Sequence, residues 1–186
     1  MNQPYRMRAV LVPLDPTPAQ EQLLRSYCGA SRFAYNWTVA TAKANLNMRD
    51  EERRTGIGEA DLTKLDWSEW SMTPLWNTVK NDVAPWYRDV TKHAFRSGVA
   101  NAAVALKNYN ESKNGMRMGK PVGFPRFKNR HSKQSFTLMD DTQTRSWFSE
   151  DSRHVRLICL ASQRTLELRV TASNSSGSTR PNRFVA

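Results

Sequence analysis

The sequence has few of the residues from which metal centres and nucleophilic active sites are built. Its 186 residues include two cysteines and three histidines. Cys28 and Cys159 are far apart, and neither has another cysteine at zinc-ligand spacing, so free thiols in a cytoplasmic protein are expected. His93, His131 and His154 have no carboxylate or cysteine at ligand spacing. We therefore expect no metal site and no cofactor.

Other features of enzymes and membrane proteins are missing as well. No apolar run approaches the ~18 residues of a membrane span, and the N-terminus lacks the apolar core of a signal peptide. There is neither a glycine-rich phosphate-binding loop nor a nucleophile elbow. The adjacent carboxylates 140–141 and 150–151 would point to opposite faces of a strand, so neither pair makes a two-carboxylate metal site. On its own, this chain is expected to have no enzymatic activity, no catalytic residue and no membrane partner.

Acidic residues are absent from one basic segment, residues 113–133. The chain carries 28 Lys and Arg against 17 Asp and Glu, a net charge of +11, and this segment holds seven basic residues and no acidic one. The parts before and after it have a net charge of only +2 each (14 against 12, and 7 against 5). Such a concentrated excess is typical of a surface that binds a phosphate backbone, although a solvated loop or a membrane-surface patch also fits. The seven residues are Lys113, Arg117, Lys120, Arg126, Lys128, Arg130 and Lys133.

Two phenylalanines interrupt the basic segment in the run Gly-Phe-Pro-Arg-Phe-Lys at 123–128. The cations would neutralise phosphates without reading sequence. Phe124 and Phe127 could stack on unpaired bases, or they could anchor the segment to the core, and the sequence leaves both roles open.

A second group of cations lies on a predicted helix. Arg88, Lys92 and Arg96 recur every four residues, so they would share one face and could line a groove or form an ordinary wet surface. Trp37 and Trp86 lie on apolar stripes and are expected in the core. The candidate nucleic-acid-binding residues are the seven cations of the basic segment together with Phe124, Phe127, Arg88 and Lys92.

Periodicity and capping signals predict a strand, a helical block and then several strands. The expected order is a strand at 5–12, helices at 18–29 and 31–47, a loop at 50–63, a short helix after 73–74, the longest helix from 85 to about 109, the basic segment, and strands at 135–138, 146–148 and 154–160. Thr17, Pro18 and Gln20 predict a capping box, and Gly29 is placed to end that helix. The first strand is expected to join the later ones, so that the helices form an insertion into a small β-domain.

Five segments carry a resemblance through their order and spacing. They are Leu-Asp-Pro-Thr-Pro-Ala-Gln at 14–20, Gly-Ala-Ser-Arg-Phe-Ala-Tyr-Asn-Trp at 29–37, 75–80 with 84–87, 102–109, and the run at 123–128. Together they resemble the N-terminal half of the TnpB/OrfB family of insertion-sequence proteins. These proteins carry a transposase label and are RNA-guided DNA endonucleases related to the small type V CRISPR effectors.

The resemblance implies an α+β fold, in which a small β-barrel-like wedge domain is interrupted by a helical recognition domain of helix-turn-helix type. It places the first wedge strand at 1–15, the helical domain at 16–112, and the basic segment with the rest of the wedge at 113–167. Residues 168–186 are low in complexity and are expected to form a disordered or frameshifted tail.

The implied function is binding of guide RNA and target DNA by a protein of a mobile element, in the context of transposition and DNA recombination. In the family, three metal-binding carboxylates and a four-cysteine zinc element lie in a nuclease half, which this chain is expected to lack as a truncated gene product. Its expected partners are nucleic acid and a separate nuclease half or a full-length relative. The alternatives are a helix-turn-helix DNA-binding regulator and the binding subunit of a split nuclease.

Overall fold

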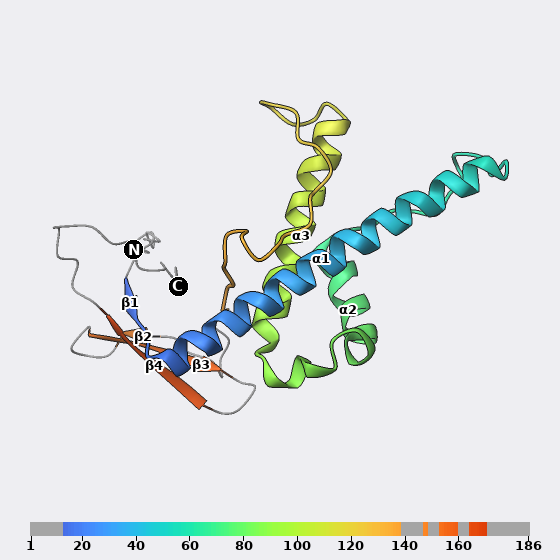
Figure 1. Ribbon diagram of the computed structural model, residues 1–186. Coiled ribbons are helices and arrows are strands. Elements are labelled where there is room, and N and C mark those ends of the chain that lie inside the picture. The colour runs from blue at the N-terminus through green and yellow to red at the C-terminus, as the bar shows by residue number, and fades with distance from the viewer. Residues whose placement is uncertain (1–12, 139–146, 149–152, 160–163, 171–186) are drawn as a thin grey trace, which may run out of the picture.

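The protein combines a helical part with a small antiparallel sheet, as the α+β prediction requires (Figure 1). The structure is a computed structural model that describes residues 13–138, 147–148, 153–159 and 164–170. In chain order the elements are β1 (Leu14–Asp15), α1 (Pro18–Arg54), α2 (Glu69–Val83), the 3-10 helix η1 (Pro85–Asp89), α3 (Lys92–Lys113), β2 (Trp147–Phe148), β3 (His154–Cys159) and β4 (Arg164–Val170).

Helix α1 begins at the predicted capping box. The Thr17 hydroxyl accepts from the backbone N–H of Gln20 at 3.4 Å, and Gln20 Oε1 accepts from the backbone N–H of Thr17 at 2.9 Å. The predicted end at Gly29 and the separate second helix are wrong, because α1 continues unbroken for 37 residues. A glycine inside a helix costs only about 0.5–1 kcal/mol relative to alanine. The buried face, which includes Tyr27 and Ala30, continues through that position and outweighs this cost.

The C-terminal end of α1 also extends past its predicted limit. Residues 50–54, which were predicted as loop, are helical, and Thr55 caps the helix. Ion pairs one turn apart support this end, with Arg53 Nη1 3.0 Å from Asp50 Oδ1. Residues 55–63 form the predicted loop and fold back along the helix, where the backbone N–H of Thr63 donates to Glu52 Oε2 at 2.9 Å.

The predicted longest helix from Pro85 is divided in two. Pro85–Asp89 form η1, Val90 is extended, and the Thr91 hydroxyl caps α3 by accepting from the backbone N–H of His93 at 3.4 Å. Arg88 therefore does not share a helix face with Lys92, and the longest helix is α1. The short helix predicted near 73–74 is α2, which starts earlier, at a Ser68 cap.

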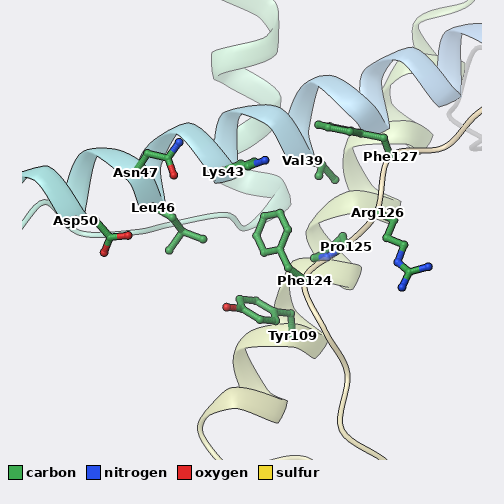
Figure 2. Close-up of a pocket in the computed structure, with 10 residues that line it drawn as sticks. All are labelled: Val39, Lys43, Leu46, Asn47, Asp50, Tyr109, Phe124, Pro125, Arg126 and Phe127. Atoms are coloured by element: carbon green, nitrogen blue, oxygen red, sulfur yellow. The ribbon is translucent and has the colours of Figure 1, made fainter.

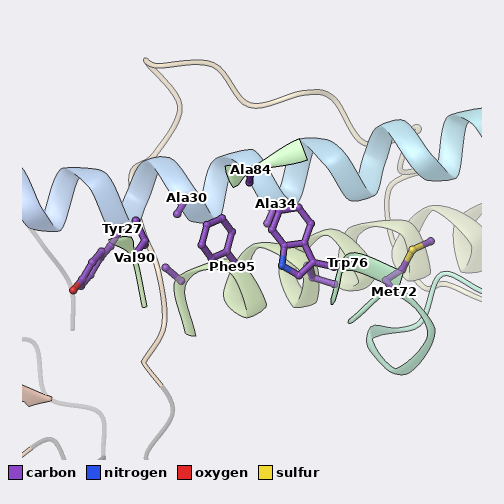
Figure 3. Packing of buried hydrophobic residues seen from close by; sticks show 10 residues of the cluster. Tyr27, Ala30, Ala34, Met72, Trp76, Ala84, Val90 and Phe95 are labelled. Carbon is purple, nitrogen blue, oxygen red and sulfur yellow. The ribbon is translucent and has the colours of Figure 1, made fainter. Parts of the chain in front are cut away.

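Helices α1 and α3 pack closely against each other. An added Cβ at Gly98 of α3 would lie 2.1 Å from the backbone oxygen of Ser31 on α1. The core beside this contact is aromatic: Trp76 of α2 stacks on Phe95 with ring centroids 5.2 Å apart (Figure 3). Trp37 packs against the same core as predicted, and Trp86 contacts Phe95 at the edge of that core, with ring centroids 5.4 Å apart, while it remains 38% exposed.

The sheet has the strand order β1-β4-β3-β2 and is antiparallel throughout. Residues 14–15, which were expected to follow the first strand, pair with the last strand, with Leu14 opposite Val170. The predicted strand at 5–12 lies outside the described residues. Among the described strands β1 and β2 are the two edges, so the sheet is open and a barrel-like closure is not observed.

The C-terminal strands differ from the prediction at two places. Residues 135–138 form no strand, because they lie along the helices, where the backbone N–H of Thr137 donates to Ser97 Oγ at 3.0 Å. Strand β4 was not predicted, and it runs to Val170, past the tail boundary drawn at 168. The sheet joins the helices through a cluster of Leu24, Val155 and Leu168. In the described part of the chain, no helix has the length and apolar character needed to cross a membrane.

Candidate nucleic-acid interface

The basic segment leaves the C-terminal end of α3 and returns alongside that helix in the opposite direction (Figure 1). Gly115 and Gly119 make the reversal with φ angles of 69° and 100°, a backbone region that favours glycine. The returning chain is fixed early, because the backbone N–H of Val122 donates to Ser112 Oγ at 2.8 Å. Beyond Lys113, the last residue of α3, the segment forms no helix.

The two phenylalanines of the segment have different environments. Phe124 packs against Tyr35, Val39 and Ala102, and its ring makes an edge contact with Tyr109 at 5.2 Å. Phe127 is 56% exposed. Phe124 is therefore the anchor, and Phe127 presents an aromatic ring to the outside.

Lys128 is the one cation of the segment that is held inside the fold. Its backbone is fixed by Asn36, which donates from Nδ2 to the Lys128 oxygen and accepts the Lys128 N–H at Oδ1, each at 2.8 Å. Its Nζ lies 4.1 Å from the centroid of the Tyr35 ring. Burial lowers the pKa of the Lys128 ammonium and raises the pKa of the Tyr35 hydroxyl. These contacts suit a structural role better than phosphate binding.

The other six cations of the segment are exposed. Within the described residues, none of them forms an ion pair with a carboxylate. Arg117 Nη1 donates to the Lys120 backbone oxygen at 3.3 Å, and Arg130 Nε donates to His131 Nε2 at 3.0 Å. Cations elsewhere are often paired, as Arg25 is with Glu21. The six that remain available are Lys113, Arg117, Lys120, Arg126, Arg130 and Lys133.

Arg88 and Lys92 lie apart from the turn of the basic segment. Lys92 begins α3 and Lys113 ends it, so about 33 Å of helix separates them. Arg88 in η1 donates from Nε to the Tyr87 hydroxyl at 3.2 Å, a contact that raises the pKa of Arg88 and lowers that of Tyr87. Arg96 is held by Glu69, with 2.9 Å between Nε and Oε1. The three cations therefore do not lie on one helix face as predicted.

A groove of about 640 Å³ lies where the basic segment crosses α1 and the end of α3 (Figure 2). Its aromatic side is formed by Tyr109, Phe124 and Phe127, and its polar side by residues of α1. The lining residues are Val39, Lys43, Leu46, Asn47, Asp50, Tyr109, Phe124, Pro125, Arg126 and Phe127. Sequence reasoning missed Lys43, Asn47 and Asp50, although their spacing along one helix places them on neighbouring turns.

In the described ranges no three side chains of His, Cys, Asp or Glu converge in a way that could hold a metal ion.

The N-terminal part of the chain matches a known domain family. Residues 1–51 match the helix-turn-helix domain of OrfB proteins of the IS605 type. The described residues of this range form β1 and most of α1, and a continuous helix occupies the position of the expected turn. The chain thus resembles OrfB proteins over its N-terminal part, which carries the helix-turn-helix match.

Comparison with curated proteins gives the same relationship. The chain is 32% identical over 164 residues to a "Putative RNA-guided DNA endonuclease" of Mycobacterium tuberculosis, found in strain CDC 1551 / Oshkosh and in strain ATCC 25618 / H37Rv. The aligned region covers 83% of this chain and 33% of each relative. The chain therefore spans about a third of the length of these relatives.

Proposed function

We propose that this chain binds a guide RNA, or its hybrid with target DNA, as the recognition part of an RNA-guided nuclease of the TnpB/OrfB type. The observation that carries the proposal is the set of six exposed cations on the basic segment, none of which is paired with a carboxylate in the described residues. Cations without acidic neighbours are free to replace the counterions of a phosphate backbone.

The fold supports this role by fixing the path of the segment. Phe124 in its cluster and Asn36 on the Lys128 backbone hold the returning chain against α1 and α3. The cations between and beside these anchors are therefore positioned before a ligand arrives, which reduces the entropy that binding must remove. Such contacts follow the shape and backbone of a nucleic acid, while base pairing to a guide would supply sequence specificity.

The proposal is tested by the salt dependence of binding. We expect the full chain to bind structured RNA from a transposon end, with an affinity that falls as salt rises. Replacing Arg117, Arg126 and Arg130 together with alanine should make the negative slope of log K against log salt less steep by about 2–3, because three phosphate contacts are lost.

A matched control removes the same charge from paired cations. Arg53, Arg54 and Lys107 each contact a carboxylate and lie outside the basic segment. Replacing these three with alanine should leave the slope close to that of the wild type. An equal fall in slope for both triple variants would show that net charge, and not this surface, governs binding.

The helix-turn-helix match favours a second candidate, a regulator that binds duplex DNA without RNA. A sequence-specific footprint on duplex DNA in the absence of RNA would support the regulator over the RNA-guided role. In the family that this chain resembles, the three metal-binding carboxylates lie in the nuclease half. Co-purification of a polypeptide with that acidic triad would instead support a split nuclease.

A further inference from the structure

We propose that the groove in Figure 2 binds one unpaired nucleotide, with its base stacked on Phe127 and its phosphates bound by Lys43 and Arg126. This inference rests on the proposed function. It adds a specific site for single-stranded nucleic acid to the general attraction of the basic segment for phosphates.

The aromatic side of the groove is fixed in place. Phe127 follows the Phe124 anchor by three residues and immediately precedes the Lys128 backbone that Asn36 holds. Its ring is nevertheless 56% exposed, and Tyr109 and Phe124 line the same groove. An exposed aromatic ring on a fixed backbone is a platform on which any base can stack.

The polar side of the groove suits the rest of a nucleotide. The exposed ammonium of Lys43 has no carboxylate partner in the described part of the chain, and Arg126 lies at the edge of the groove with its guanidinium directed outward (Figure 2). Two cations so placed can bind the phosphates on either side of a stacked base. The Asn47 amide carries both a donor and an acceptor and can pair with a base edge.

The one acidic residue of the groove is already paired. Asp50 Oδ1 accepts from Arg53 Nη1 at 3.0 Å, so its charge is balanced within α1. The groove volume of about 640 Å³ lies in the range of small-ligand sites, which is about 300–1,000 Å³. A base that is stacked and paired within a duplex cannot turn its face to Phe127, so the groove selects unpaired nucleotides.

The test compares a labelled single strand of about 12 nucleotides, a length within the range that one binding module covers, with a duplex of the same sequence. Binding of the full chain is followed by fluorescence anisotropy. Phe127→Ala should weaken single-strand binding about tenfold with an unchanged salt slope, because stacking is lost while no cation is removed. Phe127→Trp should keep the affinity, and Phe127→Leu, which keeps apolar bulk without a ring, should not.

The control is Trp70→Ala, which removes an 88% exposed aromatic ring from α2, far along the chain from the groove. It should leave single-strand binding unchanged. The inference is overturned if Phe127→Ala or Phe127→Leu binds the single strand as the wild type does, or if Trp70→Ala weakens it equally. With any of these outcomes, salt-sensitive binding of nucleic acid by the wild type would still support the proposed function. If the wild type showed no salt-sensitive binding, the proposed function itself would be overturned.

Discussion

Two glycines on the helical part have opposite environments. An added Cβ at Gly98 would lie 2.1 Å from the Ser31 backbone oxygen and 2.9 Å from the Ala34 Cβ, whereas an added Cβ at Gly29 would have no neighbour within 4 Å. Both glycines are in the interior of a helix, so their intrinsic preferences are the same. The contrast isolates the effect of helix packing.

We expect Gly98→Ala to lower the free energy of unfolding by about 1–3 kcal/mol, because backbone atoms must move apart to admit the methyl group. Gly29→Ala should raise it by about 0.5–1 kcal/mol, since alanine loses less conformational entropy in a helix. Denaturant unfolding monitored by circular dichroism measures both variants. Equal shifts of the same sign would contradict the close contact at Gly98.

Some single residues of the candidate site could be predicted from the sequence and others could not. The cations of the basic segment could be identified because charge is a property of composition, and six of the seven are exposed. Phe124 and Phe127 could not be told apart, because they differ only in what lies behind them. Tyr109 and Ala102 are close to Phe124 through the packing of α3 on the segment, which no local pattern records.

At the scale of elements, the returning chain of the basic segment is fixed by a few contacts rather than by a sheet or a helix. Asn36 makes two of these contacts, since it bonds both the N–H and the C=O of Lys128. Removing its amide leaves two backbone groups without partners in a half-buried position, at a cost of about 1–3 kcal/mol each when water cannot replace the bond.

We therefore expect Asn36→Ala to loosen this segment while the helical core remains folded. Trypsin should cleave after Arg126, Lys128 and Arg130 several-fold faster than in the wild type, as mapped by mass spectrometry. Asn110→Ala is the matched control, because its side chain is exposed and bonds only the Asn114 side chain among the described residues. Unchanged cleavage in Asn36→Ala would show that other contacts hold the segment.

Elements with strong local signals were predicted well. The start of α1 is set by a capping box within four residues, and the sequence contains all of it. Sequence reasoning missed that α1 continues through Gly29 and that the next helix breaks at Val90. Both features depend on the burial of distant side chains. Strand β4 was also missed: it pairs with its sequence neighbour β3 and with β1 near the start of the chain, and no local pattern records the second pairing.

The whole molecule joins a helical part and a sheet through a small shared cluster. Leu168 of β4 is fully buried against Leu24 of α1 and Val155 of β3, and Gln20 Nε2 donates to the Glu167 backbone oxygen at 2.8 Å. The aromatic core of α1, α2 and α3 is a second cluster of buried residues, and Phe136 and Leu166 pack against both clusters. Because the two sets of buried residues do not overlap, the two parts can differ in stability.

We expect Leu168→Ala to destabilise the sheet by about 2–5 kcal/mol, the usual effect of truncating a buried leucine. Hydrogen exchange should become faster in β3 and β4 and change little in α1 and α3. Val104→Ala, which truncates a 58% exposed side chain on α3, serves as the control and should have an effect below about 0.5 kcal/mol. Faster exchange throughout α3 in Leu168→Ala would mean that the two parts unfold as one.

Because α1 is continuous, it mechanically links regions that a turn at Gly29 would have uncoupled. Leu24 at the sheet and Asn47 at the groove belong to the same rod, about 35 Å apart along its axis. If the rod pivots at one end by about 10°, the other end moves by about 6 Å, more than one helical turn. A ligand that tilts α1 at the groove would therefore also move the sheet, because Leu24 packs against Val155 and Leu168 near the other end of the same helix.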